Sequence, residues 1–117
     1  MHIPKPTDAA RALFESLVPE DDRVEVKPMF GNVAAFVNGN MFMGVFGPDV
    51  GVKLTDTDQQ ALRGAGGRGF GPAERPMGGY VSLPDGFSEE AARPWVRKSL
   101  DYVAALPPKA KKPRKGR

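Results

Sequence analysis

The segment VAAFVNGNMFMGVF, residues 33–46, places the dipeptide Asn38-Gly39 between two apolar runs. Asn-Gly favours a type I′ turn, because that turn needs positive φ at both central residues. The segment therefore predicts a β-hairpin. Its second arm, from Met41 to Phe46, is apolar at every position. We expect this strand to lie centrally in a sheet, where it is either buried on both faces or faces a partner on one of them.

Further strands and helices are predicted on both sides of the hairpin. Alternating or apolar runs indicate strands at residues 24–28, 50–54 and 77–83. Capping residues and helical spacing indicate helices from Thr7 or Asp8 to Leu17, from Thr55 or Asp56 to about Arg63, and from Phe87-Ser88 onward. The order α-β-β-β-β-α-β-α predicts a two-layer α+β fold with a mostly antiparallel sheet and helices packed on one face.

The last helix contains a proline, Pro94, near its start. Because proline interrupts a helix interior, we expect a short lead-in turn and a main helix from about Pro94 to Leu106. Its buried stripe is predicted to comprise Trp95, Val96, Leu100, Val103 and Leu106. Trp95 should pack with Leu13, Leu17 or Leu100. If its ring is fully buried, Trp95→Ala should lower the unfolding free energy by roughly 3–5 kcal/mol.

Length and composition indicate one domain with polar ends. We assign residues 1–6 to an N-terminal tail, residues 7–106 to the domain and residues 107–117 to a basic, disordered tail. The chain has no cysteine, which excludes disulfides and thiolate chemistry. No apolar run is long enough for a membrane span, and the first residues lack the apolar stretch of a secretion signal. These features predict a cytoplasmic protein that makes no membrane contact.

The C-terminal tail carries the basic character of the chain. Its cations are Lys109, Lys111, Lys112, Arg114, Lys115 and Arg117. Without these six, 11 basic residues stand against 14 acidic ones, so residues 1–106 carry a net charge of −3. The tail has no aromatic platform and no rigid element. We therefore expect weak nucleic-acid binding without sequence preference, with a solubilising tail as the alternative.

This expectation is tested by truncation. If all six cations contact duplex DNA, the logarithm of the binding constant should fall with the logarithm of the salt concentration with a slope of about −5. A chain ending at Leu106 should lose this binding. Binding of both chains to unrelated duplexes at several salt concentrations measures the slope. Equal affinity of the two chains, or strong discrimination between sequences, would contradict the prediction.

Residues that usually perform catalysis or hold cofactors are scarce. The single histidine, His2, lies in a proline-flanked terminus, and the acids form no metal-binding pattern. The run Gly64 to Gly69 matches G-x-G-x-x-G, but a helix precedes it where a strand is required. Arg68-Gly69-Phe70-Gly71 matches half of an RNA-recognition signature, but Pro72 stands where an aromatic should follow. We therefore predict no cofactor, no metal site and no enzyme activity.

Several short motifs in order resemble the TfoX N-terminal domain family, also called the Sxy family of competence regulators. They are Met29-Phe30-Gly31, Phe36, Asn38-Gly39, Met41-Phe42, Val52-Lys53-Leu54, Pro76-Met77, Gly79-Tyr80, Leu83-Pro84 and residues 95–100. The resemblance implies an α+β fold similar to secretion chaperones and YjbR-like proteins. It also implies a link to competence and transcription regulation. Longer members have a second, C-terminal domain, so this chain resembles a single-domain member, and Asn32 replaces a common glycine.

Three functions remain open from the sequence. The first is a non-catalytic regulatory module that binds a protein partner. The second is a small-molecule-binding domain or enzyme with a pocket between the Gly-rich loop and the sheet, and its candidate polar groups are Lys53, Arg68, Arg75 and Tyr80. The third is a structural homodimer. Strand alternation predicts that Met41, Met43 and Val45 share one face and form the dimer surface, with Phe42 and Phe46 on the other face.

Overall fold

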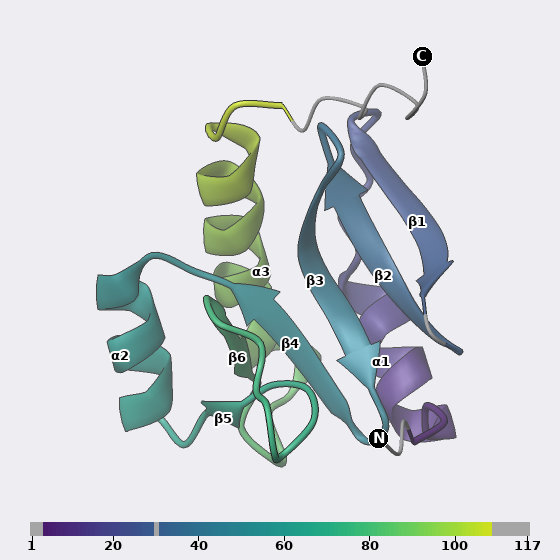
Figure 1. Ribbon diagram of the computed structural model, residues 1–117, viewed down its shortest axis with the longest axis vertical. Coiled ribbons are helices and arrows are strands. Elements are labelled where there is room, and N and C mark those ends of the chain that lie inside the picture. The colour runs from purple at the N-terminus through teal and green to yellow at the C-terminus, as the bar shows by residue number, and fades with distance from the viewer. Residues whose placement is uncertain (1–3, 30, 109–117) are drawn as a thin grey trace, which may run out of the picture.

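The computed structural model describes residues 4–29 and 31–108. The helices are α1 (Asp8–Leu17), α2 (Asp56–Gly64) and α3 (Glu89–Ala104). The strands are β1 (Val24–Met29), β2 (Asn32–Val37), β3 (Asn40–Phe46), β4 (Asp49–Lys53), β5 (Arg68–Gly69) and β6 (Tyr80–Ser82). They form one antiparallel sheet in the order β1-β2-β3-β4-β6-β5 (Figure 1). The predicted α+β class and the central position of β3 are confirmed.

The hairpin of β2 and β3 forms at the predicted dipeptide. Asn38 has φ +54° and Gly39 has φ +80°, as a type I′ turn requires. The pairing then shifts, because Phe36 lies opposite Met41 while Ala35 lies opposite Met43. Phe42 is therefore an extra residue in β3, which makes a β-bulge. A bulge reverses the alternation of side chains along the strand, and this sets the composition of both faces of the sheet.

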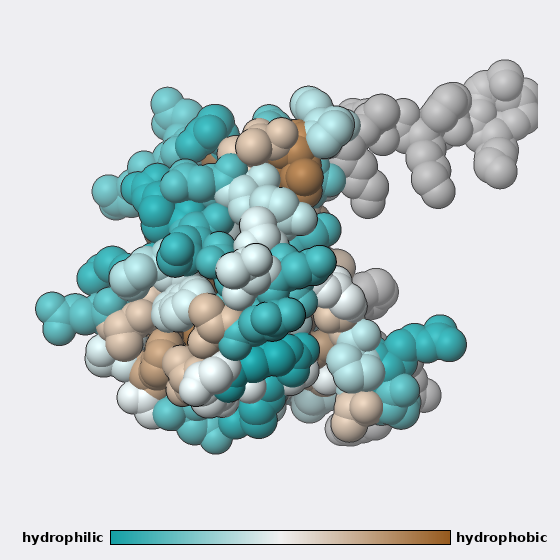
Figure 2. Space-filling model, turned by 90° about the vertical axis from the view of Figure 1, so that its left-hand side faces the viewer, coloured by the Kyte–Doolittle hydropathy of each residue, from teal (hydrophilic) through white to brown (hydrophobic). Residues whose placement is uncertain are grey.

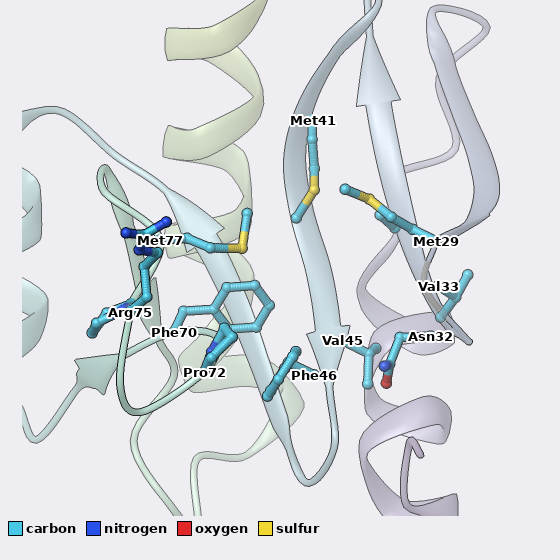
Figure 3. Close-up of a pocket in the computed structure, with 12 residues that line it drawn as sticks. Met29, Asn32, Val33, Met41, Val45, Phe46, Phe70, Pro72, Arg75 and Met77 are labelled. Atoms are coloured by element: carbon cyan, nitrogen blue, oxygen red, sulfur yellow. The ribbon is translucent and has the colours of Figure 1, made fainter. Parts of the chain in front are cut away.

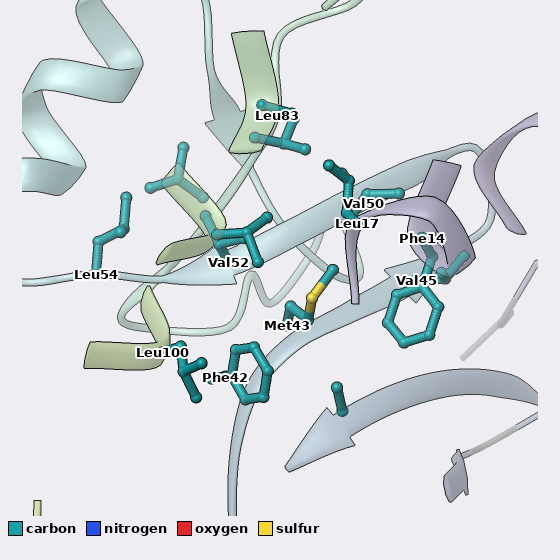
Figure 4. Close-up of a cluster of buried hydrophobic side chains, with 14 of the residues drawn as sticks. Phe14, Leu17, Phe42, Met43, Val45, Val50, Val52, Leu54, Leu83 and Leu100 are labelled. Carbon is teal, nitrogen blue, oxygen red and sulfur yellow. The ribbon is translucent and has the colours of Figure 1, made fainter. Parts of the chain in front are cut away.

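Helices α1 and α3 cover one face of the sheet, behind the strands in Figure 1. Between them and the sheet lies a core whose largest fully buried side chains include Phe14, Phe42, Met43, Leu54 and Leu100 (Figure 4). Helix α2 lies beside β6 at the edge of the sheet and contributes Leu62 to the same core. The opposite face, which we call the open face, carries no helix of the described chain.

The three helices begin at capping side chains. The hydroxyl oxygens of Thr7, Thr55 and Ser88 each accept a hydrogen bond from the backbone N–H three residues later, at 3.0, 3.2 and 3.0 Å. The expected break at Pro94 is wrong, since α3 runs continuously from Glu89 with Pro94 inside it. Pro94 is exposed, so water can reach the backbone group that its missing N–H leaves free.

The predicted buried stripe of α3 is correct in part. Val96, Leu100 and Val103 are buried, together with Ala92 and Ser99. Trp95 packs against the core but is only half-buried. The predicted loss of about 3–5 kcal/mol in Trp95→Ala assumed a fully buried ring. Trp95 is not fully buried, so this assumption does not hold.

The surface on the α2 side of the molecule is mostly hydrophilic, with small apolar areas (Figure 2). Helix α2 accounts for this, because Leu62 is its one buried residue. No helix in the described part of the chain is both long and apolar enough to cross a membrane.

Candidate functional site

A groove of about 500 Å³ lies on the open face of the sheet (Figure 3). Its lining comprises Met29, Asn32, Val33, Ala34, Met41, Val45, Phe46, Phe70, Pro72, Arg75, Pro76 and Met77. Met29 and Met41 approach from the strands β1 to β3, whereas Phe70, Pro72 and Met77 approach from the loop after β5. Thioether, phenyl and aliphatic groups therefore make up almost the whole lining.

The groove exists because the middle of the open face carries small residues. Ala34 of β2 pairs with Gly44 of β3, and Gly44 pairs with Gly51 of β4, so the three lie in one row across the sheet. Side chains of directly paired residues point to the same face. A Cβ on Gly44 would lie 2.7 Å from Cε of Met41, and a Cβ on Gly51 would overlap the ring of Phe70. Larger residues in this row would fill the groove.

The second wall of the groove is the loop of residues 70–79. Backbone hydrogen bonds within this loop close it into a compact turn. The N–H of Met77 donates to the carbonyl of Phe70 at 2.8 Å, and the N–H of Arg75 donates to that of Pro72 at 3.0 Å. The Phe70 ring is 1 % exposed, lies over Gly51 and meets Phe46 edge-on, with ring centroids 6.3 Å apart. Phe70 therefore anchors the loop to the sheet.

The lining has two polar side chains, and they play different parts. Asn32 is buried and satisfied: its Nδ2 donates to the carbonyl of Pro4 at 3.1 Å, and its Oδ1 accepts from the N–H of Gly47 at 3.2 Å. It ties the N-terminal segment to the turn after β3, a role that glycine could not perform. Arg75 is exposed at the rim, and the described residues provide no carboxylate within ion-pairing distance.

Tyr80 lies behind the groove wall, next to Phe70, with ring centroids 6.1 Å apart. Its hydroxyl donates to the carbonyl of Met41 at 2.8 Å, and this bond ties β6 to β3 across β4. Burial raises the pKa of Tyr80 to about 12. The Nζ of Lys53 lies 5.6 Å from the centre of the Tyr80 ring. Tyr80 and Lys53 therefore lie beside the groove on the same face rather than in its lining.

The raised pKa of Tyr80 predicts a loss of stability at alkaline pH. The folded pKa of about 12 exceeds the value of about 10 for an exposed tyrosine, so the neutral phenol stabilises the fold fully below pH 10. That contribution is lost as the pH rises from about 10 to about 12. In a Tyr102→Phe variant, tyrosinate absorbance reports Tyr80 alone, and it should rise near pH 12 while the unfolding free energy falls. A rise near pH 10 would contradict the burial.

The four polar groups expected at a pocket do not converge. Arg75 lines the groove, while Arg68 is directed elsewhere by ion pairs with Asp49 and Asp85, each with an N–O distance of 2.9 Å. The Gly-rich segment leads into β5, where a dinucleotide site would need a helix. Phe70 is buried, so it offers no exposed ring to a base. Sequence reasoning missed the apolar lining, because only the strand register places the three methionines and two phenylalanines around one space.

The predicted dimer surface is wrong in its composition. Met43 and Val45 belong to the core beneath the helices, at 0 % and 4 % exposure, and Phe42 is buried with them. Met41 lies on the other side of the sheet and lines the groove with Phe46. The β-bulge at Phe42 is the physical reason, since it places Met41 and Met43 on opposite faces.

The model of the TfoX N-terminal domain matches residues 13–103 of the chain. The chain belongs to the TfoX N-terminal domain family. Comparisons with curated proteins and with solved structures find no significant match. Met29, Met41, Pro76 and Met77, which the resemblance to this family rests on, all line the groove. These four residues of the TfoX-like motifs therefore meet at one place on the open face, whereas others, such as residues 95–100 in α3, lie elsewhere.

The described residues contain no cluster of three or more His, Cys, Asp or Glu side chains that could hold a metal ion. Arg75 is the one ionisable group in the lining. A guanidinium carries a positive charge and offers only hydrogen-bond donors, so Arg75 can bind an anion. The arrangement is suited to binding an apolar group that carries a negative charge.

Proposed function

We propose that this TfoX-like domain is a non-catalytic regulatory module that binds an apolar, acidic segment of a partner protein in the groove. The observation that carries the proposal is the lining of three methionines and two phenylalanines, with one cation at the rim that has no ion pair among the described residues. Family membership supports a regulatory role, and a link to transcription or competence is part of the same proposal.

The methionines favour a polypeptide as the occupant. Methionine side chains are unbranched and polarisable, so they adapt to varied apolar side chains and are common on surfaces that bind several partners. Met29, Met41 and Met77 are each partly exposed in the groove. They leave apolar surface for a partner to cover.

The charges around the groove favour an acidic segment. Arg75 lies at the rim and Lys53 lies beyond Tyr80 on the same face, and neither has an ion pair with another described residue. A carboxylate next to the bound apolar side chains would reach such cations. Surface pairs of this kind contribute up to about 1 kcal/mol and mainly select the partner.

The chain carries its own reporters for a test. Methionines occur at positions 1, 29, 41, 43 and 77, and Met43 is fully buried in the core. With ¹³C-methyl methionine labelling, peptides selected from a random phage library should shift the methyl signals of Met29, Met41 and Met77. The Met43 signal should stay in place as the internal control. Selected peptides should combine apolar residues with Asp or Glu.

Matched variants test the role of charge. Arg75→Glu should weaken the binding of acidic peptides about fivefold. Arg63→Glu, the same change on exposed α2, should leave their affinity unchanged. Failure to select peptides that shift the three groove methyls would overturn the proposal. Shifts caused by laurate but by no peptide would instead identify a small-molecule site, which the groove volume also suits.

A further inference from the structure

The two edges of the sheet are protected to different degrees. At one edge, β5 has only two residues, α2 lies alongside, and Arg68 is held by ion pairs with Asp49 and Asp85. The surface there is mostly hydrophilic (Figure 2). At the other edge, β1 has six residues, and no described element lies along its outer side (Figure 1). An open edge of this length can pair with another strand.

The outer strand β1 also carries exposed apolar surface. Val26 is 48 % exposed and is the one exposed large hydrophobic side chain among the described residues. It pairs with Ala35, a core residue, so it points to the face that the helices cover further along the sheet. Val24 and Pro28 share that face, because they lie two residues to either side. The helices do not extend far enough to cover Val26.

The open face of β1 carries opposite charges on either side of Val26. Glu25 pairs with Phe36 and Lys27 pairs with Ala34, so both point to the open face. Within the chain their charged atoms are 3.7 Å apart, and both side chains are exposed. The pattern Glu25-Val26-Lys27 is complementary to itself when the strand is reversed.

The direction of the backbone groups suits pairing at the same place. Proline has no N–H, so Pro28 fits within β1 because its nitrogen faces away from β2. Backbone directions alternate along a strand, and therefore Val24 and Val26 also direct their N–H and C=O groups outward. These groups can form a ladder with a second strand around Val26. Two donors are missing from it, because Pro28 has no N–H and the N–H of Val24 already donates to the carbonyl of Asp21 at 2.9 Å.

We propose that two copies of the chain pair through β1, antiparallel, about a two-fold axis at Val26. In this register Val26 lies beside Val26 of the second copy, and Val24 lies beside Pro28. Glu25 then lies opposite Lys27, and the symmetry repeats this ion pair. The sheets join into one, and both grooves open on the same side. The two-fold pairing uses the β1 edge of both copies, and the other edge offers only the two residues of β5, so the assembly closes at two copies.

Charge reversal tests this register in the full chain. Sedimentation equilibrium should show the wild-type chain dimerising at micromolar concentrations, as expected for a small interface. Glu25→Lys or Lys27→Glu alone places like charges opposite each other twice, and each should weaken the dimer about tenfold or more. The double variant E25K/K27E restores opposite charges and should restore the dimer. At concentrations too low for dimerisation, all four chains should unfold at similar temperatures, because both side chains are exposed.

A cysteine cross-link gives an independent test, since the chain has no cysteine of its own. Val26→Cys should form a disulfide-linked dimer on mild oxidation, because directly opposed residues of paired strands lie about 5.5 Å apart at Cα. Thr57→Cys, on exposed α2, is the control and should remain mostly unlinked. A wild-type chain that stays monomeric at high micromolar concentration would overturn the proposal. So would a dimer that is unchanged by Glu25→Lys and Lys27→Glu.

Discussion

Substitution of Gly51 by valine is expected to destabilise the domain by about 1–3 kcal/mol, the usual cost of overpacking. A side chain at this position would overlap the Phe70 ring, which lies directly over Gly51 and is 1 % exposed. The ring cannot shift freely, because it also contacts Phe46 and Tyr80. The substitution should therefore displace Phe70 and loosen the wall of the groove.

The companion variant Phe70→Ala should reverse the effect of valine at position 51. Alone, Phe70→Ala removes a buried ring and should cost about 3–5 kcal/mol. Valine at position 51 then occupies part of the empty space and suits a strand better than glycine. The double variant should accordingly be about 1 kcal/mol more stable than Phe70→Ala alone. Urea unfolding of the four chains gives the coupling free energy between the two positions.

Gly78→Val is the control for the general effect of replacing glycine by valine. Gly78 lies in the loop that forms the groove wall, and a Cβ there meets no atom within 4 Å. It should change the unfolding free energy much less than Gly51→Val. If Gly51→Val and Phe70→Ala were additive, the ring would not pack on Gly51, and the structure of the groove wall would be wrong.

The elements of the fold could be predicted wherever the signal lies within a few residues. Asn38-Gly39 fixes the hairpin, and Thr55 fixes the start of α2, because the turn and the cap each depend on local backbone geometry. Strand β5 was missed, since two residues in a Gly-rich segment carry no periodic pattern and pair only because β6 lies beside them. The break expected at Pro94 was wrong for the opposite reason, since here a local signal was present but did not decide the structure. The local effect of Pro94 was overcome by the packing of α3 on the sheet.

The groove could not be predicted from sequence, because it depends on register between distant strands. Gly44 and Gly51 are separated by a turn, and only their pairing with Ala34 makes one row of small residues. The bulge at Phe42 exchanges the faces of Met41 and Met43, and nothing in an uninterrupted apolar run indicates where a bulge occurs. A single extra residue therefore separated Met41 from Met43 and Val45, which lie in the core, and brought Met41 to the site.

The same bulge predicts a large difference between two neighbouring phenylalanines. Phe42 is 0 % exposed among core side chains that include Met43 and Leu100 (Figure 4). Its carbonyl accepts a hydrogen bond from the buried hydroxyl of Ser99 at 2.6 Å, which holds the bulge against α3. Phe42→Ala should therefore cost about 3–5 kcal/mol, much of the 5–15 kcal/mol that stabilises a typical domain.

The matched control is Phe36→Ala on the opposite face of β2. Phe36 is half-buried and its ring lies 5.1 Å from the Nζ of Lys27, a contact that contributes only about 0.5–1 kcal/mol at an exposed site. Because less of its surface is buried, Phe36→Ala should cost clearly less than Phe42→Ala and should leave the chain folded. Thermal and urea unfolding of both variants measure the difference. A larger loss for Phe36→Ala would place the bulge elsewhere and would return Met41 and Met43 to one face of the sheet.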